Sequence, residues 1–495
     1  MNLRSKVNTA IYGNKTTPLS TGITATLFIL SLLGSMSITM VFSFLPQLIK
    51  SFGITEVEVG HYAGIIAASL YSGLAFSSIL WGYLADVKGA KFATILSSLS
   101  LTIATLAFGF STFYKWALVT RFLQGFFMGV NVVTKALMAD VCDDSNQALG
   151  MTILTCSYAT GIVLGPSIGA FLAFPTIQYP KVFSKDSLFG RFQVLLPNLV
   201  LVVSFVVATS LAVCTLPSKR RKKTVDVIKD AKNSEIDELI QKKEEKNSKK
   251  AVSFSWNLFK ESKIMKVLSQ KECILASILY TIYPPVCTVF DELFPVFAAT
   301  SRKYGGYGFS TSNIGVALVT VSIISIFAVI SLFSKLIVRY GAKKVFIYCA
   351  IFQSLLFPVP VMLAKVVYNT KLFWILLILV LIIIRVCIEG TVITAVLIMN
   401  NSASADSIGT INGIGLTLSC FGRMAGPPLF GSIFSWSLKN VANVEENKHP
   451  LGFPFNQYFA FYLLAILGLL IAVFVGTFPN TVNYKKESRT EALIE

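Results

Sequence analysis

Charged residues and histidine are scarce in this sequence. Only 14% of its 495 residues are Asp, Glu, Lys or Arg, and its two histidines are His61 and His449. Because a soluble domain averages about 25% charged residues, the chain has too few of them to coat a soluble globule of its size. The eight cysteines are scattered without a C-x-x-C, which favours buried apolar thiols over a zinc site or a disulfide framework. No metal site is predicted.

Motifs of soluble enzymes are also missing. There is no Gly-rich loop ending in Lys-Ser or Lys-Thr, so direct use of ATP is not expected. Two histidines offer no plausible Ser/His/Asp arrangement, and no cleavable signal peptide precedes the first apolar run. We therefore predict neither an enzymatic activity nor a cofactor.

Long apolar runs dominate the chain, which is 54% hydrophobic. Repeated runs of about 20 or more residues indicate transmembrane helices. Their continuous rather than alternating hydrophobicity favours helices over a β-barrel, so an all-α membrane protein is predicted. The twelve expected spans are roughly residues 22–47, 58–81, 92–112, 116–139, 148–174, 193–216, 272–299, 312–338, 344–366, 371–397, 407–435 and 456–478.

Polar segments divide these spans into two bundles of six. The expected organisation is a cytosolic tail at 1–21, a bundle at 22–216, a cytosolic linker at 217–271, a second bundle at 272–479 and a cytosolic tail at 480–495. The linker is rich in Lys, Glu, Ser and Asn and cannot bury a core. Its Lys and Arg content, together with the even number of spans, favours cytosolic termini.

The net charge of +18 raises the question of nucleic-acid binding. Sixteen of the 43 Lys and Arg lie between Lys219 and Lys271, interleaved with eight Asp or Glu, and most others flank apolar runs. Basic residues in these positions are explained by their effect on membrane topology, so they do not indicate a nucleic-acid ligand. The expected partners are a lipid bilayer, a small-molecule substrate and a proton, with no nucleic acid, and the protein is expected to be monomeric.

The two halves repeat one another. A polar stretch with the sequence WGYLADVKGAK, Trp81–Lys91, has a fainter copy with the sequence LIVRYGAK, Leu336–Lys343. Two further pairs are Gly161-x-x-x-Gly165-Pro166 with Gly422-x-x-x-Gly426-Pro427, and Arg121-x-x-x-Gly125 with Arg385-x-x-x-x-Gly390. Six spans in each half with similar offsets indicate parallel repeats, which place a binding site at the membrane midplane between two rocking halves.

Polar residues inside the spans are candidates for the substrate and proton pathway, because a charge there costs about 2.5–3.5 kcal/mol on insertion scales. In span 4, Arg121 and Lys135 lie fourteen residues apart and share one helix face, with Gln124 and Asn131 close to it. We expect this stripe to line a cavity. The alternative for Arg121 is pairing with neighbouring carbonyl groups or reaching out to the membrane surface.

The second half supplies five more candidates. Arg385 and Glu389 are four residues apart and can pair, either as a static ion pair or with Glu389 as a protonatable group. Asp291 and Glu292 are expected near the outer face, as an outer cap or, if the prolines of span 7 break the helix, deeper as a proton or cation site. Arg423 is expected to face the cavity or an interhelical carboxylate.

Glycines and a proline mark a further feature in span 5. In span 5, Gly161, Gly165, Pro166 and Gly169 predict close helix packing and a local bend.

The stretch Trp81–Lys91 is interpreted as a polar hinge and cytosolic gate, carried by Gly82, Asp86, Lys88, Gly89 and Lys91. Asp86 at a helix end can meet the positive N-terminus of another helix or a basic side chain. Such a contact would hold the cytosolic side closed. The copy in the second half has Val338 where the acid would be, so unequal gating is expected.

These motifs resemble those of the major facilitator superfamily, over the whole chain except the linker and tails. The loop motif between spans 2 and 3 of that family is similar to the gate residues Gly82–Gly89 here. The span 4 motif, whose arginine is linked to proton coupling in the family, is similar to Arg121–Gly125. The span 5 antiporter motif is similar to Gly161–Gly169. The resemblance implies twelve helices in two six-helix pseudo-repeats.

Within that superfamily the chain is most similar to the plant and fungal zinc-induced facilitator-like group. The similar stretches include Trp81-Gly82, Lys135 with its flanks, Asn146-Gln147, Tyr179–Arg191, Asp291-Glu292-Leu293, Asn412-Gly413 and Phe434–Ser437. The resemblance implies a proton-coupled exporter or organelle loader, in a plasma membrane or a vacuolar or lysosomal membrane. Its substrates would be small solutes such as metal chelators, organic ions, auxin or drug-like compounds. Free zinc is poorly supported, because the acid-and-histidine stretch of plant members is absent after span 6.

The sequence is thus read as a secondary transporter that exchanges a small organic solute for protons by alternating access. Arg121 would tune coupling, and Glu389 or the Asp291/Glu292 pair would carry the proton. The alternatives are a nutrient uniporter or symporter of the same fold, which the span 5 motif disfavours, and a transport-inactive receptor or scaffold, which the intact intramembrane charges disfavour.

Overall fold

The computed structural model describes residues 18–142, 146–217, 269–366, 369–404, 407–445 and 451–484. The predicted linker and both tails lie outside these residues except for a few positions at their edges. The domain boundaries drawn at those segments therefore stay predictions.

The first half of the described chain forms six spans, two of which are interrupted. They are α2 (Thr21–Thr39) continued by η1 (Met40–Ser43) and α3 (Leu45–Ser51), α4 (Val59–Lys88), α5 (Ala90–Gly109), α6 (Tyr114–Phe126) continued by α7 (Val130–Val141), α8 (Gln147–Leu172) and α11 (Leu195–Thr215). Short helices lie between the spans, namely η2 (Glu56–Glu58), α9 (Pro175–Gln178) and α10 (Leu188–Arg191).

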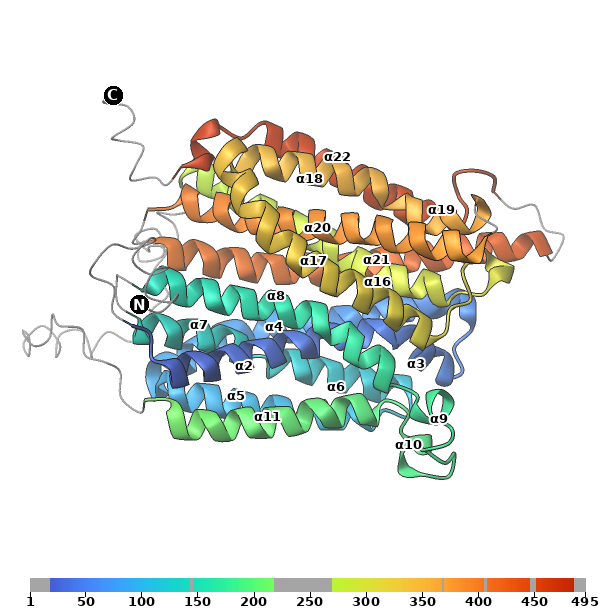
Figure 1. Cartoon of the computed structure of the whole chain (residues 1–495), viewed down its shortest axis with the longest axis horizontal. Helices are drawn as coiled ribbons and strands as arrows, with labels where there is room; N and C mark the ends of the chain where they lie inside the picture. Colours follow the sequence, from blue (N-terminus) through green and yellow to red (C-terminus); the bar gives the residue numbers. More distant parts are fainter. Residues whose placement is uncertain are drawn as a thin grey trace, which may run out of the picture.

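The second half repeats this arrangement. Its spans are α16 (Lys271–Ala299), α17 (Thr311–Tyr340), α18 (Ala342–Leu356) continued by α19 (Pro358–Val366), α20 (Thr370–Ser402), α21 (Ile408–Glu445) and α22 (Phe459–Gly476). The short helices η3 (Arg302–Tyr304) and η5 (Asn480–Asn483) complete it. In Figure 1 the first half, blue to green, and the second half, yellow to red, lie side by side.

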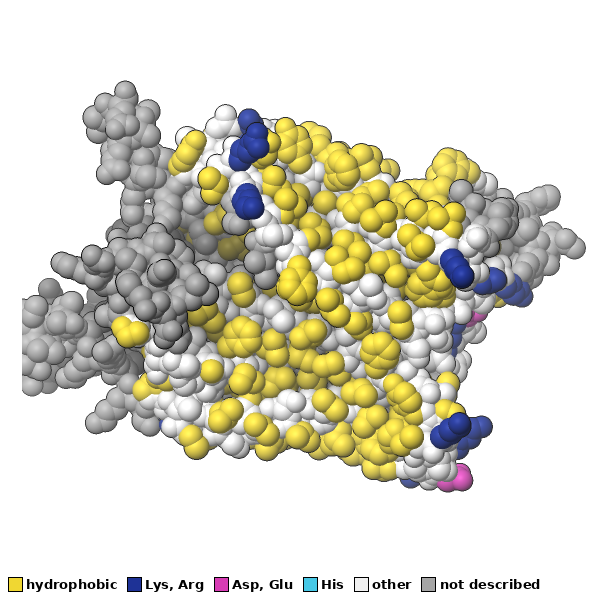
Figure 2. Space-filling view, viewed as in Figure 1, with side chains coloured by type: hydrophobic (Ala, Val, Ile, Leu, Met, Phe, Trp, Pro, Cys, Tyr) yellow, Lys and Arg dark blue, Asp and Glu magenta, His cyan; other side chains and the backbone are white. Residues whose placement is uncertain are grey.

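Twelve helical spans confirm the predicted all-α membrane architecture. Within the described residues, eleven of these spans are long and apolar enough to cross a membrane, and the twelfth, α21, packs along α4 and α16. The middle of the face drawn in Figure 2 is covered by hydrophobic side chains, while Lys and Arg gather toward its two ends. This is the surface expected of a bundle whose middle meets lipid tails.

Both ends of the described chain lie at the same end of the bundle, on the left in Figure 1, as an even number of spans requires. We call the end where α2 begins and η5 lies the proximal end. The opposite end, with α3, α9 and α10, is the distal end.

The predicted polar hinge at Trp81–Lys91 is wrong in its extent. The helix α4 continues to Lys88, and Trp81 is buried inside it with its indole N–H donating to the carbonyl oxygen of Phe126 at 2.8 Å. Only Gly89, with φ of 95°, interrupts the helix before α5 begins. A positive φ is open to glycine at little cost, which explains why one residue suffices for the break.

The copy in the second half has the same geometry. Gly341 has a φ of 79° and separates α17 from α18 as Gly89 separates α4 from α5. The lysine two residues after this glycine makes the same kind of hydrogen bond in both halves. Lys91 Nζ donates to the carbonyl oxygen of Val213 at 2.8 Å, and Lys343 Nζ donates to that of Phe478. Each lysine thus binds the C-terminal end of the last span of its own half, where a cation is favoured by the helix dipole.

The close helix packing predicted for the span 5 glycines is confirmed, and the structure shows that the partner helix is α2. A Cβ atom on Gly161 would lie 2.3 Å from the carbonyl oxygen of Leu32, and one on Gly165 would lie 2.4 Å from Thr39 Oγ1. Pro166 has no N–H to offer the carbonyl of Ile162 four residues earlier, and Thr39 Oγ1 donates to that oxygen at 3.0 Å. The glycines allow the approach, and the proline creates the acceptor that α2 satisfies.

The two halves are joined tightly in the distal part of the bundle. On α4, a Cβ on Gly64 would lie 2.3 Å from the carbonyl oxygen of Pro427 on α21. In the proximal part of the same two helices, a Cβ on Gly82 or on Gly413 would meet no atom within 4 Å. Nearer the middle, Ser322 Oγ on α17 donates to the carbonyl oxygen of Val163 on α8 at 3.2 Å.

A charged contact fastens the distal end. Glu56 Oε1 accepts from Lys50 Nζ at 2.6 Å and from the backbone N–H of Ser301 at 2.8 Å. Lys50 Nζ also donates to the carbonyl oxygen of Ala299 at 3.1 Å. We call these four residues the distal latch. They tie the loop before α4 to the end of α16 in the other half.

Replacing Gly161 by Ala should destabilise the protein by about 1–3 kcal/mol, because the new methyl group overlaps α2. The measurement is the apparent melting temperature of the protein in detergent. Gly413→Ala is the matched control, since its methyl enters open space and alanine stabilises a helix interior by about 0.5–1 kcal/mol over glycine. Equal melting temperatures for both variants would contradict the packing described.

Replacing Glu56 by Ala should loosen the distal end, because it removes the acceptor shared by Lys50 and Ser301. Spin labels at Ser51→Cys and Lys303→Cys, in a background with the native cysteines replaced, would report their separation by pulsed electron resonance. A longer mean distance is expected. Glu58→Ala, whose partner Lys439 is 53% exposed, is the control and should change the distance little. An unchanged distance in the Glu56 variant would argue against the latch.

Candidate substrate and proton pathway

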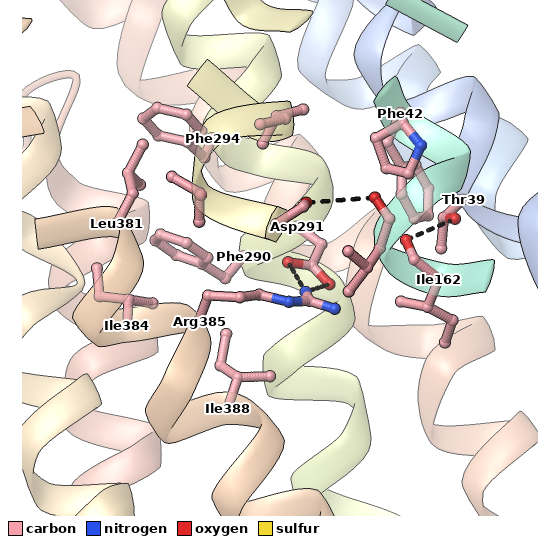
Figure 3. A pocket seen from close by; sticks show the side chains of 15 residues that line it. Thr39, Phe42, Ile162, Phe290, Asp291, Phe294, Leu381, Ile384, Arg385 and Ile388 are labelled. Carbon is pink, nitrogen blue, oxygen red and sulfur yellow. Dashed lines mark hydrogen bonds and ion pairs between the residues drawn. The ribbon is translucent and has the colours of Figure 1, made fainter. Parts of the chain in front are cut away.

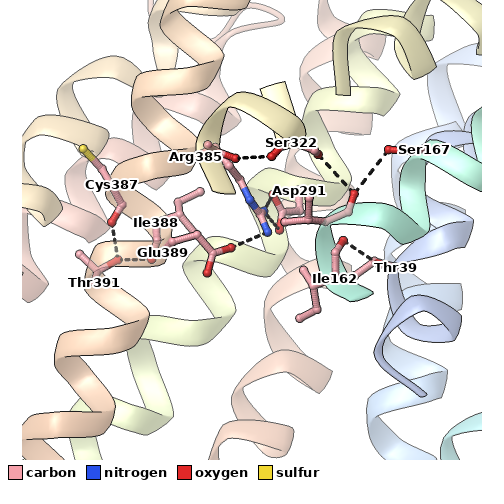
Figure 4. A network of polar contacts seen from close by, with 12 residues as sticks. Thr39, Ile162, Ser167, Asp291, Ser322, Arg385, Cys387, Ile388, Glu389 and Thr391 are labelled. Carbon is pink, nitrogen blue, oxygen red and sulfur yellow. Dashed lines mark hydrogen bonds and ion pairs between the residues drawn. The ribbon is translucent and has the colours of Figure 1, made fainter. Parts of the chain in front are cut away.

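A triad of charged side chains lies inside the second half (Figure 4). The Arg385 guanidinium on α20 donates through Nη1 to both carboxylate oxygens of Asp291 on α16, each at 3.0 Å. Its Nη2 donates to Glu389 Oε1 on the next turn of α20 at 2.7 Å. The predicted pairing of Arg385 with Glu389 is confirmed, and Asp291 is a second partner that the sequence did not indicate.

The depth expected for Asp291 and Glu292 is wrong. Three prolines lie within α16, yet the helix is unbroken from Lys271 to Ala299. Because Asp291 binds Arg385, which lies near the middle of α20, it sits well inside the bundle rather than at an outer mouth. Glu292 is 4% exposed and is not an outer cap either.

The triad carries one more acid than base. With both carboxylates ionised its net charge is −1, and one added proton makes it neutral. The side chains of Arg385 and Glu389 are only 13% and 14% exposed, so a surplus charge there is costly in an apolar surrounding. The arrangement can therefore hold a proton on either carboxylate while Arg385 remains paired with the other.

A small cavity adjoins the triad between the two halves (Figure 3). Its volume is about 50 Å³, which suits a few water molecules and is far below the 300–1,000 Å³ typical of pockets for drug-sized ligands. Thr39, Ile162 and Pro166 line it from the first half, and Asp291 and Arg385 from the second. It is a site for water or protons rather than for an organic solute.

Arg121 and Gln124 are buried against other helices of the first half. Arg121 is 1% exposed and donates to the carbonyl oxygens of Ser37 and Ile38 on α2, and to Gln124 Oε1 at 2.9 Å. This is the carbonyl pairing that stood as the alternative to cavity lining. In this structure Arg121 serves to hold α6 to α2.

The two C-terminal residues of the predicted stripe, Asn131 and Lys135, lie on a separate helix, because the span is interrupted between α6 and α7. Lys135 is exposed, and its Nζ lies 6.0 Å from the centre of the Tyr158 ring on α8. Asn131, one turn earlier, has a buried Oδ1 without a hydrogen-bond partner. The four residues that share a face by spacing are therefore split into a buried pair and a pair nearer the proximal end.

Arg423 lies where the two halves meet. Its guanidinium carbon is 5.5 Å from the centre of the Tyr71 ring on α4, in the other half. Tyr158 and Tyr280 are also within electrostatic range of it. Among the described residues no carboxylate lies within 4.0 Å of Arg423, so the interhelical acid considered from the sequence is not its partner there. Sequence reasoning missed the tyrosines because they carry no charge to mark them.

Glu292 is a buried acid next to the boundary between the halves. Its Oε2 has no hydrogen-bond partner. One turn earlier on α16, Thr288 lies beside Tyr71 of α4, so the face that carries Glu292 is turned toward the first half. An ionised carboxylate without a partner in such a place is strongly disfavoured, which makes a neutral Glu292 the stable form in this structure.

The predicted gate residues lie at the proximal end of α4 and the start of α5. Asp86 and Lys88 are exposed, and Lys91 binds α11 of its own half. Val338, the counterpart of Asp86, is 88% exposed. A closing role for Asp86 concerns a state in which the proximal ends meet, so it stays a prediction.

No group of three His, Cys, Asp or Glu among the described residues could hold a metal ion.

Comparison with known proteins decides the family. Residues 27–427 match the Major Facilitator Superfamily. The chain belongs to this superfamily. It is therefore a multi-pass integral membrane protein of a transporter family, with a lipid bilayer as its surrounding and a small molecule as its substrate.

Two curated relatives within the superfamily come from Arabidopsis thaliana. Protein ZINC INDUCED FACILITATOR 1 is 30% identical over 424 residues, which cover 84% of this chain and 84% of the relative. Protein ZINC INDUCED FACILITATOR-LIKE 1 is 28% identical over 461 residues, covering 90% and 89%. The resemblance to this group of the superfamily is thereby confirmed.

Solved structures show the superfamily fold. A D-xylose-proton symporter superposes with a TM-score of 0.68 at 14% identity, covering 94% of this chain and 99% of the symporter. At that identity the likeness concerns the fold alone. It agrees with the arrangement of the chain in two side-by-side halves.

Replacing Arg385 by Leu should destabilise this superfamily member by about 3–5 kcal/mol, because it leaves two carboxylates without their cation. The apparent melting temperature in detergent at neutral pH would show the loss. The loss should shrink at acidic pH, since protonated carboxyl groups need no cation. Asp291→Asn is the milder comparison, because Glu389 still pairs with Arg385. A pH-independent effect of the Leu variant would contradict the ion-pair geometry.

Proposed function

We propose that this transporter exchanges protons for a small organic solute by alternating access. The triad of Asp291, Arg385 and Glu389 is the observation that carries the proposal. It holds one acid in excess of its base, well inside the bundle, beside a water-sized cavity bounded by both halves. One carboxylate would be enough to neutralise Arg385 in a structural ion pair. The second carboxylate lets the triad gain or lose one proton and so change its net charge.

A proton on Asp291 would alter the contact between α16 and α20. It removes the ion pair to Arg385 and leaves Glu389 as the sole anionic partner. Because α16 also lies next to α4 and the distal latch, a change at Asp291 can bias the distal closure. Glu292, neutral while buried here, is a second acid that would release its proton once the halves separate around it.

Direction and location follow from the same proposal. The Lys and Arg of the linker favour a cytosolic proximal end, so the distal closure corresponds to a state that faces the cytosol. From there the solute would be exported across a plasma membrane or loaded into a vacuolar or lysosomal compartment. The span 5 glycines and Pro166, which resemble the antiporter motif of the superfamily, support exchange over symport.

The test is solute flux into proteoliposomes with an imposed proton gradient and a pH-sensitive dye inside. A panel of metabolites should reveal a solute whose uptake is accompanied by proton release from the vesicles. Asp291→Asn and Glu389→Gln should each slow gradient-driven flux on the order of tenfold, the effect of about 1.4 kcal/mol, while solute exchange without a gradient persists.

The control is Asp186→Asn, a change at an exposed acid in the distal loop after α8. It should leave gradient-driven flux unchanged. Wild-type coupling in both triad variants would overturn the proton assignment. Flux that ignores the gradient in the unmodified protein would overturn antiport itself and favour a uniporter.

A further inference from the structure

Four basic side chains lie within the helices that form the interior, and their partners separate them into two classes. Arg121 donates to two backbone carbonyls and to Gln124, and Arg385 is held by two carboxylates. Lys135 and Arg423 differ. Among the described residues neither has an acidic side chain within 4.0 Å, and both lie over tyrosine rings. Arg423, partly buried where the halves meet, and Lys135, exposed nearer the proximal end, are thus two positive charges without an acidic partner among the described residues.

The two cations share a neighbouring tyrosine. Lys135 Nζ lies over the ring of Tyr158, and the same tyrosine is within electrostatic range of Arg423. Tyr71 lies against Arg423 and Tyr280 is also near it. Lys135, Tyr71 and Tyr158 belong to the first half, whereas Tyr280 and Arg423 belong to the second. The cluster therefore spans the boundary that opens and closes in alternating access.

Binding of an anion would stabilise the positive charges of this cluster. A cation within a membrane protein is costly unless it is paired, and cation–π contacts return only about 0.5–2 kcal/mol each. The Nε atoms of Arg121, Arg385 and Arg423 are all buried without a hydrogen-bond partner. Arg121 and Arg385 donate through their other nitrogens, whereas Arg423 makes no hydrogen bond to the described residues, so its donors are unused. A carboxylate would satisfy it with charge-assisted hydrogen bonds, which are about twice as strong as neutral ones.

The walls of the cluster specify more than charge. Tyr158 lies under Lys135 and Tyr71 under Arg423, with Tyr280 within electrostatic range of Arg423. Tyrosine rings offer flat apolar faces on which a planar body can stack. Their hydroxyl groups can donate to further oxygens of a bound molecule. The acids paired with a base, Asp291 and Glu389, lie instead in the triad, whose cavity of about 50 Å³ is too small for an organic cation, and Glu292 is neutral while it is buried.

We propose that Lys135, Arg423 and the tyrosines Tyr71, Tyr158 and Tyr280 form a binding site for an organic carboxylate with a flat apolar body. As a transport site it rests on the proposed function. A carboxylate held between Lys135 and Arg423 joins the two halves by its own charge. The proton and the solute then occupy different sites, the triad and this cluster.

Binding to the purified protein in detergent tests the site without any gradient. The probes are 2-naphthoate, the neutral 2-naphthamide and the cationic 2-naphthylmethylamine, which share one ring system and differ in charge. Isothermal calorimetry should show binding of the naphthoate at least about tenfold tighter than that of the amide, and weaker still for the amine. Equal or tighter binding of the amide or the amine would overturn the proposal.

Variants locate the binding. Lys135→Gln and Arg423→Gln should each weaken naphthoate binding about tenfold or more, and Arg423→Lys should recover part of the loss because it restores the charge. Lys181→Gln, at an exposed position in the distal loop, is the control and should bind as the unmodified protein does. Melting curves check folding. If Arg423→Gln does not fold, Lys135→Gln, an exposed position, still decides the question.

The outcomes separate this inference from the proposed function. Charge-selective binding that depends on Lys135 and Arg423, combined with flux that ignores a proton gradient, would uphold the carboxylate site and refute antiport. Proton-coupled flux of cationic solutes only, unaffected by Lys135→Gln, would refute the carboxylate site and uphold antiport. Unchanged naphthoate affinity in both Gln variants would overturn the inference by itself.

Discussion

Inside a bilayer every polar group needs a partner within the protein, and most of this structure follows from that constraint. Arg121 reaches the carbonyl oxygens of α2 because no water is there to solvate it. Pro166 deprives the carbonyl of Ile162 of its helical donor, and Thr39 supplies another. Arg385 is held between two acids. Several buried polar atoms lack a partner, and among them Glu292 and Arg423 are the groups from which we infer a proton and a ligand.

The two halves satisfy the constraint by the same devices, which keeps each of them a rigid body. A single glycine of positive φ joins the second and third spans of each half, and a lysine two residues on binds the end of the last span. Glycines of span 5 pack on span 1, and Gly422 of span 11 packs on span 7. Motion is thereby directed to the boundary between the halves, where the distal latch and Ser322 supply contacts that can break and re-form.

Charge is distributed unevenly in the interior. Two acids, Asp291 and Glu389, pair with Arg385 on α16 and α20 beside a cavity for water. The cations without an acidic partner lie over tyrosines, Lys135 within the first half and Arg423 across the boundary. This separation allows a proton and an anionic solute to bind without competing for one group. Coupling between the two sites then passes through α16, which carries Asp291 and Glu292 on adjacent faces and Thr288 beside Tyr71.

The sequence by itself determined the twelve spans, the two-fold repeat, the family and the Arg385–Glu389 pair, because hydrophobic length, repeated motifs and spacing along one helix are properties of local sequence. It misjudged whatever depends on a second helix. Asp291 was placed too near a surface because its partner, Arg385, is 94 residues away. The hinge at Trp81–Lys91 shrank to Gly89 because Trp81 finds an acceptor on α6. Arg121 and Lys135 share a face by spacing, yet neighbouring helices bury one and leave the other exposed. Only the tertiary structure could decide these points, since burial and pairing are set by what packs alongside.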